Sequence, residues 1–262
     1  MSARLDMTSL MINTVLTGTP TDQPPLLIVH GLYGSARNWG AIAKRMSEDR
    51  LVLTVDMRNH GYSDWHNGHS YPDMAADLDE VIASYGTPMD VIGHSMGGKA
   101  AMVLALKNPD LVRRLIVADI APVSYTHTQI GFIAAMRGLD LSLVEKRSDA
   151  DRLLATEVED AGIRAFLLQS LDIKTKRWRL NLDVLEAEMP KIMGFPDLDI
   201  QFNDATLFLS GGASDYVRPE HRSGIKTLFP KARFARIPGA GHWLHAEKPR
   251  AFVETAHAFL GA

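Results

Sequence analysis

The chain has 262 residues, a formal net charge of −3 and no cysteine. These values exclude disulfides, a cysteine nucleophile and thiolate metal sites, and the charge is unlike that of a nucleic-acid-binding domain. Apolar residues make up 46% of the sequence, enough for the core of one large domain with or without an insertion. Met1–Asp6 lacks a leader pattern and no apolar run could span a bilayer. We therefore expect a cytoplasmic protein without a nucleic-acid or membrane partner.

Short apolar runs alternate with amphipathic segments through most of the sequence. The apolar runs are typical of buried parallel strands, and the segments between them have helical spacing. This alternation predicts an α/β fold with a mostly parallel central sheet flanked by helices. The expected strands are 10–17, 26–30, 51–56, 89–92, 115–119, 206–210 and 233–237, and the expected helices are 39–46, 73–85, 100–107, 219–229 and 249–260.

The alternation stops between the strands expected at 115–119 and 206–210. Strand patterns nearly vanish there, and helical periodicity takes their place. We expect a helical cap at 122–204, inserted into a core of residues 1–121 and 205–262 and lying over the strand ends. The expected cap helices are 130–139, 149–157, 163–171 and 182–192.

A G-H-S-M-G motif at 93–97 lies between an apolar strand and a segment of good helix formers. In that context a G-x-S-x-G motif predicts a nucleophile elbow, a sharp turn that exposes a serine hydroxyl. Small residues at Gly93, Gly97 and Gly98 remove side chains that would collide in so tight a turn. The next helix begins beneath Ser95, so its dipole favours negative charge beside the serine.

A serine hydroxyl becomes a good nucleophile only when a base removes its proton. The best of the ten histidines is His242, which follows the last expected strand in a glycine-rich loop. That position lies at the carboxyl edge of a parallel sheet, where ligand sites of open α/β sheets form. His245 is the near competitor, and we interpret it as a supporting residue. His94, within the motif, is expected to pack or bond locally.

Two aspartates can supply the acid that orients the imidazole and stabilises the imidazolium. Asp119 ends the strand that follows the elbow helix, and Asp215 lies in the loop after the strand at 206–210. Both are expected near His242, and position along the chain leaves the choice between them open.

Six segments carry a resemblance to a known family and span nearly the whole chain. They are V-H-G-L-Y-G-S at 29–35, D-M-R-N-H-G at 56–61, G-H-S-M-G-G-K at 93–99, D-I-A-P-V at 119–123, F-L-S-G-G at 208–212 and G-H-W-L-H-A-E-K-P at 241–249. The sequence resembles the α/β-hydrolases. Within them it resembles small bacterial esterases active on short acyl esters and acyl-CoA thioesters, and their mitochondrial abhydrolase relatives.

The resemblance implies a serine hydrolase that needs no cofactor or metal and cleaves small esters or acyl thioesters through an acyl-enzyme. It also bears on the acid, because the family often has G-x-x-D-x-x-V in the loop after this strand. Aligning Gly211 and Val217 with that pattern puts Ser214 at the usual acid position. The resembled subgroup takes its acid from the earlier strand end, so the resemblance implies Asp119 as the acid with Ser214 assisting, and we keep Asp215 as the alternative.

The resemblance further implies an oxyanion hole formed by the backbone N–H groups of Leu32 and Met96. The same triad can serve C–C bond hydrolysis, perhydrolysis or lactone hydrolysis, and the scaffold can also bind a ligand without catalysis. We expect a small-molecule substrate and a monomer or homodimer. The residues expected to contact the substrate are His30, Gly31, Phe132, Met136 and Trp243, although apolar cap residues at helical spacing can equally form the core of the cap.

Two further groups of residues have structural interpretations. Asp56 and Arg58 are expected to brace neighbouring loops, without a chemical role. His66 and His69 are expected in a solvated loop, since no acidic or sulfur partner completes a metal-ligand set.

Overall fold

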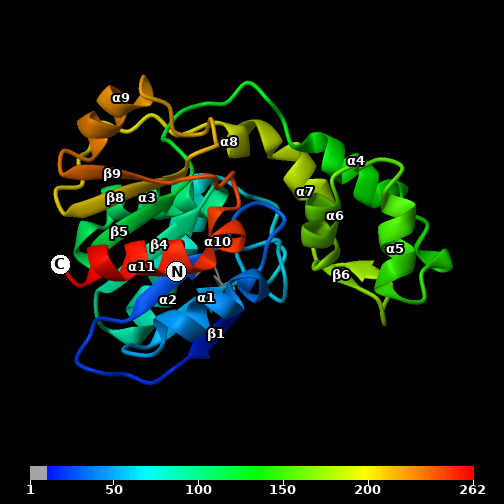
Figure 1. Ribbon diagram of the computed structural model, residues 1–262, viewed down its shortest axis with the longest axis horizontal. Helices are drawn as coiled ribbons and strands as arrows, with labels where there is room; N and C mark the ends of the chain where they lie inside the picture. Colours follow the sequence, from blue (N-terminus) through cyan, green and yellow to red (C-terminus); the bar gives the residue numbers. More distant parts are fainter. Residues whose placement is uncertain (1–10) are drawn as a thin grey trace, which may run out of the picture.

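A seven-stranded sheet in the order β1-β3-β2-β4-β5-β8-β9 forms the centre of the protein (Figure 1). The structure is a computed structural model and describes residues 11–262, so Met1–Asp6 and Leu10 lie outside the described residues. Every neighbouring pair is parallel except β1 with β3. The strands are β1 (Thr14–Thr17), β2 (Leu26–Val29), β3 (Val52–Val55), β4 (Met89–His94), β5 (Val112–Ala118), β8 (Ala205–Gly211) and β9 (Ala232–Ile237). The expected α/β fold class is confirmed.

Two layers of helices bury both faces of this sheet. Along β2, Leu27 and Val29 join one core with α2 and α3, whereas Leu26 and Ile28 join a second core with α1 and α11. Alternate side chains of a strand point to opposite faces, which explains why the buried strands read as continuous apolar runs. The helices are α1 (Gly40–Met46), α2 (Tyr71–Tyr85), α3 (Met96–Lys107), α9 (His221–Leu228), α10 (Leu244–Glu247) and α11 (Pro249–Leu260), with 3₁₀ turns at η1 (Ala36–Trp39) and η2 (Pro109–Leu111).

Between β5 and β8, the regular elements of residues 122–204 are mostly short helices, and the segment extends beyond the edge of the sheet in Figure 1. The single helix expected at 182–192 is wrong. Pro190 cannot donate a backbone hydrogen bond to Glu186, so two short helices form instead. The inserted segment also contains a hairpin that periodicity did not indicate. Its elements are α4 (Ile130–Gly138), η3 (Leu141–Leu143), α5 (Arg147–Leu154), α6 (Ala161–Leu168), β6 (Leu171–Asp172), β7 (Arg177–Trp178), α7 (Leu182–Ala187) and α8 (Met189–Met193).

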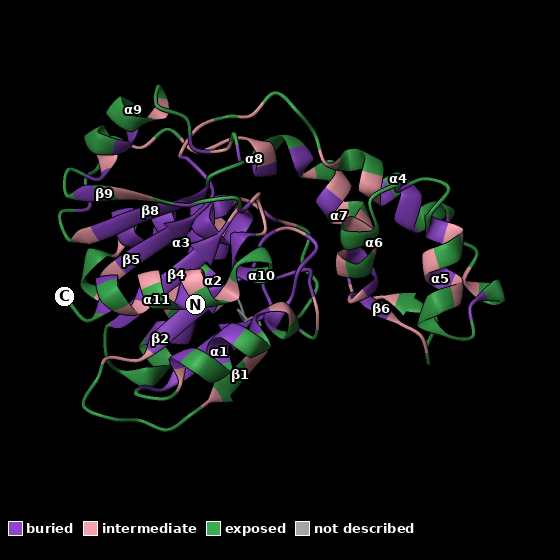
Figure 2. Cartoon of the chain, viewed as in Figure 1, coloured by how far each residue is buried: buried purple, intermediate pink, exposed green. Residues whose placement is uncertain are grey.

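Burial falls off from the sheet outward, as Figure 2 shows by the purple strands and the green outer faces of the helices. Polar contacts join the inserted segment to the core. The Ser170 hydroxyl donates to the carbonyl of Tyr33 at 2.9 Å, and the Tyr71 hydroxyl donates to the carbonyl of Ile192 at 2.5 Å. Within residues 11–262, no helix is both long and apolar enough to cross a membrane.

Candidate active site

Ser95 occupies a one-residue turn between the end of β4 and the start of α3. Its backbone has φ 51° and ψ −121°, a left-handed conformation that costs about 1–3 kcal/mol in a non-glycine residue. A Cβ added to Gly93 would collide with the carbonyl oxygen of Gly97, and one added to Gly97 would collide with that of His30. The turn therefore has the geometry that the motif predicts, and only glycine fits at both flanking positions.

The structure brings Ser95, His242 and Asp119 together. The Ser95 Oγ lies 3.1 Å from His242 Nε2, and His242 Nδ1 lies 2.8 Å from Asp119 Oδ2. The carboxylate only accepts hydrogen bonds when ionised, so Nδ1 carries the ring proton and Nε2 is left to accept one from the serine. The His242 ring also stacks on Tyr216, with centroids 4.0 Å apart and planes 20° apart.

Asp119 is fully buried and each of its carboxylate oxygens has a partner. Oδ1 accepts from the backbone N–H of Gly211 at 3.0 Å, and Oδ2 accepts from the Ser214 hydroxyl at 2.5 Å as well as from His242. Ser214 therefore lies in hydrogen-bond contact with Asp119, and its assisting role stays a prediction. Asp215, the alternative acid, is exposed, and its backbone carbonyl accepts a hydrogen bond from the Arg218 guanidinium at 3.1 Å. Of the two candidates, the structure brings only Asp119 to His242.

His94 links the serine turn to the histidine loop. Its Nε2 donates to the backbone carbonyl of His242 at 2.8 Å, so its hydrogen bond is not local, but its buried ring does pack, against Trp39 and His245. The sequence could not reveal this contact because the partner lies 148 residues away. His245 is buried and stacks on Trp39 at 4.1 Å, consistent with a supporting position. Burial lowers the pKa of His94 well below its ordinary value and that of His245 to about 3, so both stay neutral near pH 7.

Leu32 and Met96 are the residues expected to supply the N–H groups of an oxyanion hole. Met96 is the first residue of α3, where helical N–H groups have no intrahelical partner. The carbonyl of Gly31 is held by His30 Nδ1 at 2.7 Å and by the N–H of Gly34 at 3.0 Å. Since the C=O and N–H of a trans peptide point in opposite directions, the Leu32 N–H points away from His30. Leu32 and Met96 both line the cavity that contains Ser95.

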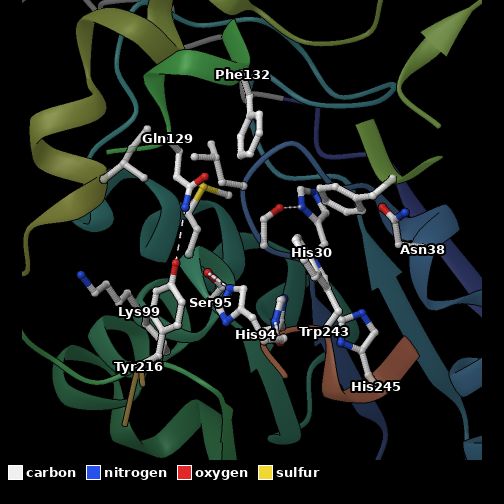
Figure 3. Close-up of a pocket in the computed structure, with 18 of the residues that line it drawn as sticks. His30, Asn38, His94, Ser95, Lys99, Gln129, Phe132, Tyr216, Trp243 and His245 are labelled. Carbon is white, nitrogen blue, oxygen red and sulfur yellow. Dashed lines mark hydrogen bonds between the residues drawn. The ribbon is translucent and has the colours of Figure 1, made fainter. Parts of the chain in front are cut away.

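That cavity has a volume of about 300 Å³ and a mostly apolar wall (Figure 3). His30, Gly31, Phe132 and Trp243 line it as expected, although both ring nitrogens of His30 are engaged by backbone groups. Met136 does not line it, which corrects that expectation. The Met136 side chain is buried in the hydrophobic core instead, because the helix face that starts at the cavity continues into packed interior.

Lys99 is a cavity residue that the sequence reasoning missed. Its ammonium donates to three backbone carbonyls: Val123 at 2.8 Å, Met193 at 3.2 Å and Gly194 at 2.5 Å. Burial lowers the pKa of Lys99 to about 7. The signal was present, since a lone lysine four residues after Ser95 falls on the same helix face as the serine, among apolar neighbours.

The brace and loop predictions have different outcomes. Arg58 makes a two-pronged ion pair with Asp77, each bond 2.6 Å long, and Asp56 accepts from the N–H of Ala36 at 2.7 Å, so both brace loops as expected. His66 is exposed, but the solvated-loop prediction is wrong for His69. That ring is buried, lies 3.3 Å from the sulfur of Met96, and has its pKa lowered to about 3 by burial.

A mostly parallel sheet with a serine on a sharp strand-to-helix turn, and a histidine at the sheet's carboxyl edge, is the arrangement of an α/β-hydrolase. The sequence matches the family described as "Alpha/beta hydrolase family" over residues 26–255. The chain belongs to this family.

Several of its relatives carry esterase or lipase names. It is 45% identical over 248 residues to the mouse (Mus musculus) "sn-1-specific diacylglycerol lipase ABHD11", covering 90% of this chain and 81% of the relative. It is 38% identical over 240 residues to "Esterase YbfF" of Escherichia coli strain K12, covering 90% and 92%. The solved structure of a "Marine microorganism esterase" superposes with a TM-score of 0.90 at 39% identity, covering 96% of this chain and all of that one (100%). The chain is thus a hydrolase of the esterase/lipase group.

Proposed function

We propose that this hydrolase cleaves small carboxylic esters, with Ser95 as nucleophile, His242 as general base and acid, and Asp119 as the residue that orients His242. The relay of hydrogen bonds from Ser95 Oγ through His242 to Asp119 carries the proposal, at 3.1 Å and 2.8 Å. Both distances are within the reach that proton transfer needs.

Acylation begins when the Ser95 oxygen attacks the ester carbonyl carbon and its proton passes to His242 Nε2. The carbonyl electrons move onto oxygen, and the oxyanion accepts from the N–H groups of Leu32 and Met96. Each such donor is worth about 2.7–4 kcal/mol of barrier. The C–O bond to the alcohol then breaks, and the departing oxygen takes the proton from Nε2.

Deacylation repeats the sequence with water. His242 Nε2 accepts a proton from water as the water oxygen attacks the acyl carbon, and the same two N–H groups hold the second oxyanion. The bond to Ser95 breaks, the serine oxygen regains its proton from Nε2, and the free acid leaves. Throughout, the Asp119 carboxylate stabilises the imidazolium that forms at each transfer.

The lining of the cavity favours an apolar acyl group. Phe132, Ile163, Phe166 and Ile192 supply apolar surface, and the volume of about 300 Å³ is at the small end for ligand sites. Two similar proteins are named for ester cleavage, as a diacylglycerol lipase and as an esterase. Oxygen esters are therefore the proposed substrates, and acyl thioesters are the second candidate because the same attack serves both.

Active-site labelling and burst kinetics test the proposal. The wild-type protein should react with a fluorophosphonate probe and release an initial burst of p-nitrophenol from p-nitrophenyl butyrate. Ser95→Ala should lose both signals while keeping its melting temperature. Turnover by Ser95→Ala at the wild-type rate would contradict the proposal. Parallel kcat/KM measurements on butyryl esters and thioesters of matched size decide between the two substrate classes.

A further inference from the structure

A second cavity, of about 620 Å³, neighbours the catalytic cavity. The Asn38 amide, which lines the catalytic cavity, donates to the Gln169 side chain at 2.8 Å, and Gln169 lines the second one. The larger cavity lies between the β1 edge of the core and the inserted segment. We call it the basic cavity because four cationic side chains line it: Arg37, Arg147, Lys174 and Arg179.

Three of these four cations have no carboxylate partner among residues 11–262. No ion pair involves Arg37, Arg147 or Lys174, and the one hydrogen bond from the Arg147 guanidinium goes to the carbonyl of Leu171 at 3.4 Å. Burial, and then the positive charge of Arg37, lower the pKa of Arg147. Two guanidinium groups and an ammonium that line one cavity give it a positive potential that attracts an anion.

The acidic side chains of the cavity do not supply that anion. Asp56 is committed to the backbone N–H groups of Ala36 at 2.7 Å and Tyr62 at 2.9 Å, and to the amide of Asn13 at 2.8 Å.

Asp172 is likewise committed. It pairs with Arg179 at 2.6 Å and accepts from the backbone N–H of Lys174 at 3.0 Å. The Arg179 guanidinium also lies 3.8 Å from the ring of Tyr62, which fixes it further. The side chains of Arg37, Arg147 and Lys174 are therefore exposed at the cavity wall, and no ion pair among residues 11–262 involves them.

We propose that the basic cavity binds a small molecule that carries a phosphate group, held by Arg37, Arg147 and Lys174. Guanidinium groups match the tetrahedral oxygens of phosphate with paired hydrogen bonds, and the ammonium adds a point charge. Val15, Leu171 and Ile173 give the same cavity an apolar wall for the organic part of the ligand. Its volume of about 620 Å³ is within the range of small-molecule sites.

Isothermal titration of inorganic pyrophosphate into the 262-residue chain at low salt tests this site. Saturable binding with one ligand per chain is expected, and it should weaken as salt is added. The Arg37→Gln/Arg147→Gln double variant should bind at least about tenfold more weakly, since a lost charge-assisted bond is worth about 1.5–3 kcal/mol. The Arg37→Lys/Arg147→Lys double variant should have an intermediate affinity for pyrophosphate, because it keeps both positive charges but loses the paired hydrogen bonds of the guanidinium groups.

Arg152→Gln is the matched control. Arg152 lies on the same helix as Arg147, its side chain is 76% exposed, and it does not line the cavity. The control removes one positive charge and should leave the affinity for pyrophosphate within about twofold of the wild type, since the exposed pair it breaks is a weak one. Absence of saturable binding by the wild type, or an equal loss in Arg152→Gln, would overturn the proposal.

Two further arms identify the source of the phosphate. A KM increase in the double variant for an ester with a phosphate on its alcohol, but not for a neutral ester, supports a substrate group that spans both cavities. Unchanged KM values for both esters, with pyrophosphate binding lost, support a separate effector. The protein can also be sedimented with phosphatidylglycerol vesicles. If it sediments with them and added pyrophosphate does not release it, the proposal would be overturned in favour of a lipid surface. None of the binding measurements depends on Ser95.

Discussion

Replacing Asp119 by asparagine changes one atom of the proposed relay and preserves the shape of the side chain. Two donors meet at Asp119 Oδ2, the Ser214 hydroxyl at 2.5 Å and His242 Nδ1 at 2.8 Å. An amide NH₂ at that position is itself a donor, so it could not accept a hydrogen bond from the Ser214 hydroxyl or from His242 Nδ1. His242 can then keep a bond only as the other tautomer, with Nδ1 accepting and the proton on Nε2. That tautomer points a hydrogen at Ser95 and cannot accept the serine proton.

The expected loss follows from this tautomer change. The equivalent substitution in a serine protease triad lowers kcat about ten-thousand-fold, which corresponds to about 5 kcal/mol of barrier. We expect a loss of that order in kcat for p-nitrophenyl butyrate, with KM changed little because Asp119 does not line the cavity. The melting temperature should fall only modestly, since the bond from the Gly211 N–H to Oδ1 is retained.

Asp215→Asn is the matched control for this experiment. It makes the same chemical change at an exposed carboxylate 27 residues before His242. The sequence had left both aspartates as candidates for the acid. Its kcat should stay within about twofold of the wild type, as is usual for surface substitutions. If Asp119→Asn kept more than a tenth of the activity, or if Asp215→Asn lost as much, the assignment of the acid would be refuted.

Three other substitutions test the surroundings of the relay. In Gly31→Ala the new Cβ would lie 2.9 Å from His94 Nδ1, so the loop that carries the Leu32 N–H must shift. We expect kcat/KM to fall about a hundredfold as a result. Gly131→Ala is the control, because its Cβ would enter open space and the activity should not change. Because folding lowers the pKa of Lys99 from 10.5 to about 7, the unfolded state binds more protons between these values. Urea titrations should therefore show that the free energy of unfolding of the wild type rises relative to that of Lys99→Met from pH 7 upward, by at most about 1.4 kcal/mol per pH unit. Below pH 6 the difference between the two free energies should not depend on pH. Ser214→Ala removes a hydrogen bond to a buried carboxylate and should lower kcat about tenfold, with recovery in Ser214→Thr; unchanged kcat would contradict the assisting role.

Local patterns predicted the sheet and the position of the serine well. Apolar runs such as 26–30 read as buried parallel strands because both faces of the sheet are covered, and the glycines around Ser95 marked the turn. His242 was identified from its place in a glycine-rich loop after the last expected strand, since the loops after parallel strands gather at one edge of the sheet. These inferences depend only on neighbours in sequence and on rules of topology.

The features that were missed depend on contacts between distant parts of the chain. Phe132 and Met136 lie four residues apart on the same face of α4, yet only Phe132 reaches the cavity, because helical spacing does not say what covers each position. His94 bonds to the His242 loop, and His69 packs behind Met96, through loop conformations that no periodicity encodes. The antiparallel pairing of β1 with β3 was also not predictable, because the pattern of apolar residues does not indicate the direction of a strand in the sheet.

Strand register explains how so few residues can be held in reacting geometry. His94 pairs with Ala118 across β4 and β5, and Ala118 pairs with Leu209 across β5 and β8. Ser95 and Asp119 therefore leave the sheet side by side, each with a left-handed φ, of 51° and 52°. Their own N–H groups stay in the ladder, bonded to the carbonyls of Ala118 at 3.0 Å and Leu209 at 2.9 Å. Strain of about 1–3 kcal/mol at each residue persists only where the surroundings over-determine it, and here the buried strands provide that constraint. The rigidity of the sheet and the placement of the proposed relay are thus one property of the fold, and a slip of one residue between β4 and β5 would separate the serine from its acid.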